Sequence, residues 1–159
     1  MVEKRLKRIK ALVMDVDGTL TDGGIYIGND GEVMKRFDVK DGYAIHNILP
    51  NMEIVPIIIT GRTSEIVARR CRELGITNLV QGSQDKVADM KKILSVAGIS
   101  FEETAYIGDD INDIQAMKVV GLSACPADAV DDVKKVCNYI CRNDGGKGAV
   151  REFVERIVN

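Results

Sequence analysis

Two aspartates, Asp15 and Asp17, stand two residues apart at the end of an apolar run that begins at residue 11. Burying a carboxylate is costly, so this position favours a chemical role over a packing role. Asp15 can attack phosphorus in line to give an aspartyl-phosphate, and Asp17 can give a proton to the leaving alcohol and later take one from the attacking water. The alternatives are a calcium loop and simple surface acids, but an EF-hand loop needs its ligands within about twelve consecutive residues between helices.

Three further polar segments follow apolar runs later in the chain. They are Thr60-Gly61-Arg62, the single Lys86, and GDDIND at residues 108–113. Each has a plainer explanation by itself, as a helix cap, a solvated lysine, or caps and surface acids. Because ligands of an open α/β sheet bind beyond the carboxyl ends of its strands, the convergence of these segments favours one shared site.

The predicted site brings several carboxylates together. Three or four of them in a partly desolvated pocket would repel one another by several kcal/mol. A hard divalent cation removes this repulsion, and magnesium prefers one or two carboxylates, a backbone oxygen and waters. Lys86, Thr60 and loop N–H groups are donors without an acid partner of their own, which suits a phosphate group. The residues therefore predict chemistry on a phosphate bound to Mg²⁺.

Short segments rich in valine and isoleucine alternate with longer segments of helical period. This alternation predicts a Rossmann-like α/β fold, in which helices cover both faces of a doubly wound parallel sheet. The expected strands lie at residues 11–16, 54–60, 78–80, 104–108, 121–124 and 138–141. The expected helices lie at residues 42–49, 64–74, 84–97, 111–119, 129–136 and 148–158.

Residues 25–37 interrupt the alternation with two β-like stretches around Asn29-Asp30-Gly31. This composition predicts a tight hairpin that projects after the first strand. An isolated two-stranded ribbon is marginally stable, so we expect its apolar residues to be buried against other copies of the chain, or else to fold back onto their own domain. These apolar residues are Ile25, Tyr26, Ile27, Val33, Met34 and Phe37.

The composition fits one globular domain over residues 1–159, because 45% of the residues are hydrophobic. The 22 basic and 24 acidic residues are interspersed and give a net charge of −2, so we expect neither nucleic acid nor a membrane as partner. The basic residues within 4–10 are expected to form a solvated lead-in. Without an apolar run of about 18 residues or a signal-like segment, a cytoplasmic location is expected. The four cysteines, which form no Cys-x-x-Cys pair, are expected to be reduced thiols.

Along nearly the whole chain, these segments resemble the four motifs of the haloacid dehalogenase-like phosphatases in order and spacing. The first motif is D-x-D-G-T-L-T-D at residues 15–22, and the last is G-D-D-x-x-D at residues 108–113. The resemblance implies that Asp15 is the nucleophile, Asp17 the general acid/base, and Thr60, Gly61 and Lys86 the phosphate-binding residues. It also implies a magnesium ion on Asp15, the carbonyl of Asp17 and Asp109, with Asp110 or Asp113 supporting it.

Longer stretches resemble the 3-deoxy-D-manno-octulosonate 8-phosphate (KDO 8-phosphate) phosphatases and relatives that act on nine-carbon sugar acid phosphates. They include DGGIYIGNDGEVMKRFDVKDGYAI, ITGRTSEIVARRCRELGI and GGKGAVREFVERI. The resemblance implies an enzyme of lipopolysaccharide biosynthesis without a cap domain. It further implies a homotetramer in which hairpins form a small barrel and one subunit covers the site of the next.

The substrate carboxylate needs a cation, and four residues are candidates. Arg62 and Arg70 lie near the site in sequence, while Lys147 and Arg151 are expected to reach a neighbouring subunit. Arg62 favours the octulosonate branch, since the resemblance implies glutamate there in the nine-carbon branch. The C-terminal segment 145–159 is expected to be a helix with a glycine-rich lead that either closes over the sugar or caps the helix. Thr19 departs from the valine common in the octulosonate branch, which we expect to affect strand–loop packing and not the acids.

The leading hypothesis is a Mg²⁺-dependent phosphomonoester hydrolase for KDO 8-phosphate that works through an aspartyl-phosphate. One alternative is a phosphatase for nine-carbon keto sugar acid 9-phosphates. Another is a non-catalytic assembly module related to domains fused to sugar-nucleotide synthetases, although the full set of acids argues against it. A phosphotransferase or dehalogenase on the same fold is a further alternative.

Overall fold

The structure is a computed structural model that describes residues 9–159. The basic segment expected to be a solvated lead-in therefore lies outside the described residues except for its last positions. Within residues 9–159, no helix has both the length and the apolar character needed to cross a membrane. The assignment of residues 1–159 to a single domain stays a prediction.

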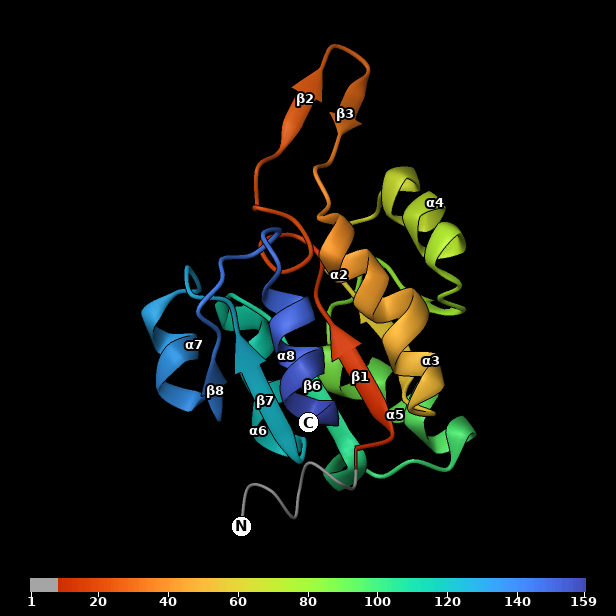
Figure 1. Ribbon diagram of the computed structural model, residues 1–159. Helices are drawn as coiled ribbons and strands as arrows, with labels where there is room; N and C mark the ends of the chain where they lie inside the picture. Colours follow the sequence, from red (N-terminus) through yellow and green to blue (C-terminus); the bar gives the residue numbers. More distant parts are fainter. Residues whose placement is uncertain (1–8) are drawn as a thin grey trace.

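Six parallel strands form the main sheet, in the order β5-β4-β1-β6-β7-β8. Figure 1 labels β1, β6, β7 and β8 of this sheet. Every strand of this sheet overlaps a predicted segment, with ends that differ by at most two residues, which confirms the expected parallel sheet. The strands are β1 (Ala11–Met14), β4 (Val55–Ile59), β5 (Asn78–Val80), β6 (Thr104–Ile107), β7 (Leu122–Cys125) and β8 (Tyr139–Ile140).

Side chains of the central strand alternate between the two faces of the sheet, and both faces are buried. Leu12 and Met14 join one hydrophobic cluster, while Ala11 and Val13 join the other. The first cluster is covered by η1 (Ala44–Ile48), α3 (Leu49–Asn51), α4 (Glu65–Leu74) and α8 (Ala149–Val158), and α2 (Val39–Tyr43) leads into η1. The second is covered by α5 (Lys86–Ala97), α6 (Ile114–Val119) and α7 (Asp131–Val136). Short 3₁₀ turns, η2 (Phe101–Glu103) and η3 (Ile111–Asp113), precede β6 and α6.

Side-chain caps set where two of the site helices begin. The Ser64 hydroxyl accepts a hydrogen bond from the Val67 N–H at the start of α4, and the Asp85 carboxylate accepts one from the Ala88 N–H at the start of α5. Such caps satisfy N–H groups that have no partner within the helix. As a result, Lys86 is the first residue of α5, two residues later than the predicted start at residue 84.

The helix predicted at residues 42–49 is longer and less regular than expected. It runs from Val39 to Asn51, and its middle part, η1, is a π-helical turn. Pro50, the second residue of α3, has no N–H to donate, so a regular ladder of hydrogen bonds cannot pass through it.

The predicted hairpin is present as β2 (Tyr26–Gly28) and β3 (Gly31–Met34), and it projects away from the sheet (Figure 1). Ile27 is 71% exposed and Val33 60% exposed, so the ribbon does not fold back onto its own domain. Phe37 is the exception, because it packs against the core and its ring lies beneath the Arg70 guanidinium. The described residues contain no cap domain between β1 and β4.

Candidate active site

The carboxyl ends of the central strands bring the predicted motif residues to one edge of the sheet. The Asp15 N–H donates to the carbonyl of Ile107 at the end of β6, and the Thr60 N–H donates to the carbonyl of Val80 at the end of β5. An open cleft of about 160 Å³ lies here, several times the ~30 Å³ that one water occupies in the liquid. It is lined by Asp15, Asp17, Thr60, Gly61, Arg62, Asp110 and Asn112.

The sequence suggested that Lys86 has no acid partner, but the structure shows two. Its Nζ lies 2.8 Å from Asp15 Oδ1 and 2.6 Å from Asp113 Oδ1, and all three side chains are buried. The neighbouring carboxylates raise the pKa of Lys86 even though burial opposes this. Lys86 is therefore a fixed positive charge held beside Asp15.

Asp113 is saturated with hydrogen bonds. Its Oδ1 accepts from Lys86 and from the hydroxyl of Tyr106, and its Oδ2 accepts from the N–H groups of Asp109 and Asp110. With both oxygens occupied, Asp113 orders the loop after β6 and holds Lys86. Sequence analysis missed Tyr106, although a tyrosine within an otherwise apolar buried strand is a signal, because a buried phenol needs a partner.

Asp109 approaches the loop after β1 very closely. A Cβ at Gly18, whose φ is +89°, would lie 2.0 Å from Asp109 Oδ2, so only glycine fits there. The Thr19 hydroxyl donates to Asp109 Oδ1 over 3.2 Å. The expectation that Thr19 affects packing and not the acids is therefore wrong, because its hydroxyl binds one of them directly.

The charges of the cleft suit a cation. One oxygen from each of Asp15, Asp109 and Asp113 can lie within 4.8 Å of the others. Burial, together with the charge of Asp113, raises the pKa of Asp15 to about 6 despite the nearby Lys86. Burial, followed by the charges of Asp15 and Asp113, raises the pKa of Asp109 to about 8. Since this excess negative charge is what a hard divalent ion relieves, the donor set fits magnesium.

Comparisons with known proteins agree with this geometry. A family model described as haloacid dehalogenase-like hydrolase matches residues 73–153. The chain is 43% identical to the KDO 8-phosphate phosphatase KdsC of Escherichia coli BL21-DE3, over 99% of this chain and 83% of that protein. It is 42% identical to KdsC of Yersinia pestis over the same shares of both chains. This chain belongs to the KDO 8-phosphate phosphatase family of haloacid dehalogenase-like hydrolases.

Solved structures of the family have the same fold. The cobalt-bound phosphatase of Haemophilus influenzae matches with a TM-score of 0.94 at 38% identity, over 97% of this chain and 90% of that one. The phosphatase of Moraxella catarrhalis in complex with magnesium, phosphate and KDO matches with a TM-score of 0.94 at 38% identity, over 99% and 90%. The predicted Rossmann-like fold and the predicted family are thus confirmed.

Asp17 lies at the mouth of the cleft in this KDO 8-phosphate phosphatase family protein. Its carboxylate contacts two cationic side chains. Its Oδ1 pairs with Lys35, and its Oδ2 lies 3.9 Å from Arg62 Nε. Sequence analysis missed Lys35, which follows β3 at the base of the hairpin. The signal available was a lysine three residues after Glu32 on a ribbon otherwise rich in exposed apolar side chains.

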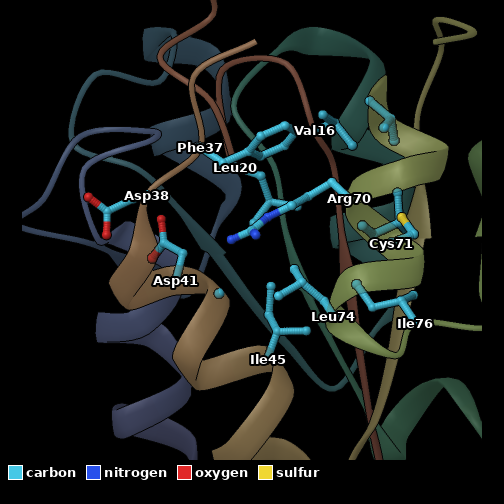
Figure 2. Close-up of a pocket in the computed structure, with 13 residues that line it drawn as sticks. Val16, Leu20, Phe37, Asp38, Asp41, Ile45, Arg70, Cys71, Leu74 and Ile76 are labelled. Carbon is cyan, nitrogen blue, oxygen red and sulfur yellow. The ribbon is translucent and has the colours of Figure 1, made fainter. Parts of the chain in front are cut away.

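Of the candidates for the substrate carboxylate, the structure brings Arg62 to the cleft of its own chain. Arg70 instead reaches between α2 and α4 into a buried pocket near Asp41 and Leu74 (Figure 2). A Cβ at Gly42 would lie 2.4 Å from Arg70 Nη2, so this glycine makes room for the guanidinium.

The two C-terminal candidates also lie outside the cleft of their own chain. Lys147 pairs with Asp144 over 3.2 Å, and Arg151 pairs with Glu155 over 2.6 Å. The glycines before α8 pack on the loop after β1 instead of standing free, since the Gly146 N–H donates to the Thr19 carbonyl. The reach of Lys147 and Arg151 into a neighbouring subunit stays a prediction.

Proposed function

We propose that this protein is a Mg²⁺-dependent phosphomonoester hydrolase that acts on an acidic sugar phosphate, with KDO 8-phosphate as the preferred substrate. The observation that carries the proposal is the buried contact between Lys86 and Asp15 inside a group of three convergent carboxylates. In the proposed roles, the nucleophile Asp15, the phosphate-binding Lys86 and the carboxylates for the metal ion lie within a few ångströms of one another. The names and ligands of the relatives support the substrate class.

The reaction follows from the residues of the cleft. An Asp15 carboxylate oxygen bonds to phosphorus as the bond from phosphorus to the sugar oxygen breaks, and the electron pair stays on that oxygen, which takes a proton from Asp17. Water then attacks the aspartyl-phosphate, Asp17 takes its proton, and phosphate and free Asp15 result. Lys86, Thr60 and the Gly61 backbone hold the phosphoryl oxygens.

Asp15, the carbonyl of Asp17 and Asp109 would hold the magnesium ion, with Asp110 and Asp113 in support. When bound, the ion neutralises charge on the phosphoryl oxygens and so lets a carboxylate approach phosphorus. Asp113 supports the site through the loop and Lys86, because both of its oxygens already accept hydrogen bonds.

Arg62 is the proposed partner of the sugar carboxylate. Its side chain is 46% exposed at the mouth of the cleft, where it can turn toward a ligand. A guanidinium can bind a carboxylate through two parallel hydrogen bonds. Arginine at this position favours KDO 8-phosphate over nine-carbon sugar acid 9-phosphates, since the family resemblance implies glutamate here in the nine-carbon branch; those phosphates remain the alternative substrates.

A homotetramer is the proposed assembly, formed through the exposed apolar hairpin. An apolar ribbon of this kind gains stability when it packs against copies of itself. In such an assembly Lys147 and Arg151 belong to surfaces that can complete a neighbouring site. A cytoplasmic location and a role in lipopolysaccharide biosynthesis fit the proposed substrate.

Kinetics on a panel of phosphates test the proposal. The expected result is a kcat/KM for KDO 8-phosphate at least about tenfold above that for nine-carbon analogues, which corresponds to about 1.4 kcal/mol of transition-state binding. Equal and poor rates on all sugar acids would remove the substrate assignment. Absence of phosphate release from every ester would favour the non-catalytic assembly module, and phosphate release that survives EDTA would contradict the proposed need for magnesium.

A further inference from the structure

Lys35 is a lysine with a nearly inaccessible side chain at the base of an exposed hairpin. Its side chain is 1% exposed, and its Nζ contacts Asp17 Oδ1 and lies 3.3 Å from Glu32 Oε1. Moving an ammonium group out of water costs free energy, so a lysine side chain is rarely buried unless acids pair with it. The two acids here come from different places, one from the hairpin and one from the loop after β1.

Glu32 extends this contact to the other loops of the cleft. Its Oε1 also accepts a hydrogen bond of 3.0 Å from the Ser64 hydroxyl, the cap of α4. The Ser64 N–H in turn donates to Gln81 Oε1 over 2.7 Å, just after β5. A continuous set of polar contacts therefore joins the hairpin base to the loops after β1, β4 and β5.

We propose that Lys35, held in place by Glu32, is a positioning residue for Asp17. The proposal rests on the proposed function, because it concerns the group that transfers protons in that reaction. Arg62 is the other cation near Asp17, but it is more exposed and lies 3.9 Å from Oδ2. Lys35 is thus the main constraint on where the Asp17 carboxylate lies relative to Asp15.

Two other roles for Lys35 make different predictions. A cation that binds the sugar carboxylate would affect only substrates that carry one. A purely structural lysine would disturb the cleft as a whole and slow every phosphate ester to the same degree. A positioning residue for the proton donor affects esters according to how much their leaving group needs a proton.

The test uses phosphate esters without a carboxylate, in a series from p-nitrophenyl phosphate through phenyl phosphate to an alkyl phosphate. The variants are Lys35→Met, Lys35→Arg and Glu32→Gln, with Lys91→Met on the exposed face of α5 as the matched control. The quantity compared is kcat/KM, which reports the steps up to release of the alcohol.

We expect Lys35→Met to lower kcat/KM for the alkyl phosphate about 10- to 100-fold and that for p-nitrophenyl phosphate by less than about threefold, because nitrophenolate leaves without a proton. Lys35→Arg should recover part of the loss, and Glu32→Gln should show a smaller loss of the same pattern. Lys91→Met should match the unmodified protein. A crystal structure of Lys35→Met should show the Asp17 carboxylate displaced.

An equal loss at every ester of the series, or no loss at any of them, would overturn the role of Lys35. The series contains no sugar acid, so it tests the role of Lys35 even if KDO 8-phosphate is not the preferred substrate. If the unmodified protein released phosphate from no ester at all, the proposed function would fall and the positioning role with it.

Discussion

Lys86 Nζ lies 2.6 Å from Asp113 Oδ1, and the Asp113 side chain has no solvent exposure. The same Nζ contacts Asp15, so the cation that is proposed to bind phosphate is already fixed before any substrate arrives. Groups fixed in advance need little reorganisation during a reaction, which is the main source of electrostatic stabilisation in enzymes.

Asp15→Asn should abolish turnover with the fold intact. The amide is nearly the same size as the carboxylate but is a poor nucleophile for phosphorus. Phosphate release measures activity, and circular dichroism with thermal unfolding measures the fold. Residual activity above about a tenth of the parent would argue against an aspartyl-phosphate, since the loss of a covalent nucleophile costs far more than tenfold.

Asp113→Ala should lower the free energy of unfolding by about 3–5 kcal/mol, because it leaves Lys86 with one buried partner fewer and frees two loop N–H groups. Tyr106→Phe is the matched variant, since it removes a single donor to Asp113 and should cost about 1 kcal/mol. Urea unfolding measures both. A cost for Asp113→Ala no larger than that for Tyr106→Phe would show that the carboxylate does not organise the loop.

Stability without metal should fall as the pH rises from about 4 to about 8. The pKa values of Asp15 and Asp109 are raised from 3.8 to about 6 and about 8, so in this window the folded protein holds protons that the unfolded chain has released. Because magnesium binds the ionised carboxylates, it should stabilise the protein more at pH 8 than at pH 5. Urea unfolding in EDTA and in excess magnesium at both pH values checks this. Equal stabilisation at both would contradict the proposed metal site.

The hairpin should control assembly. Ile27→Asp and Val33→Asp place charges at positions that are 71% and 60% exposed in the single chain, so each should give a monomer with an intact core. Val96→Asp, at a 93% exposed position on α5, is the control and should leave assembly unchanged. Light scattering after size exclusion measures the mass. An unmodified protein that is monomeric at micromolar concentration would remove the shared-site hypothesis.

Gly18→Ala should weaken magnesium binding by more than about tenfold, because a Cβ there would lie 2.0 Å from Asp109 Oδ2 and would move that carboxylate. Gly31→Ala is the control for backbone strain alone, since its φ is +113° and nothing lies within 4 Å of its Cβ position. Calorimetric titration with magnesium compares the two. Similar binding by both variants would show that Gly18 serves only the turn.

Much of the site could be predicted because its signals are local. A buried parallel strand must end where polar residues begin, so the apolar runs ending near Asp15 and Thr60 located the carboxyl edge of the sheet directly. The helical period predicted a helix start at residue 84, two residues before Lys86. The spacing of the motifs then identified the family, which the comparisons confirmed.

Other features depend on contacts between residues far apart in the chain. The partners of Lys86 are 71 and 27 residues away, and the Thr19 hydroxyl meets Asp109 across 90 residues. Such contacts leave no local pattern, and the sequence had suggested that Lys86 was unpaired. The sequence makes Arg70 a candidate for the substrate carboxylate because it lies on the helix that follows Thr60, and the structure adds that α4 directs its side chain into the pocket beside Gly42.

The sequence by itself determined the order of strands and helices, the position of the acids and the family, because backbone conformation and burial follow from periodicity within a few residues. Only the tertiary structure decided which acid serves which cation, that Tyr106 and Asp113 hold Lys86, and that Lys35 of the hairpin meets Asp17. Pairing of buried charges is set by distance in space, and folding alone brings those side chains within reach of one another.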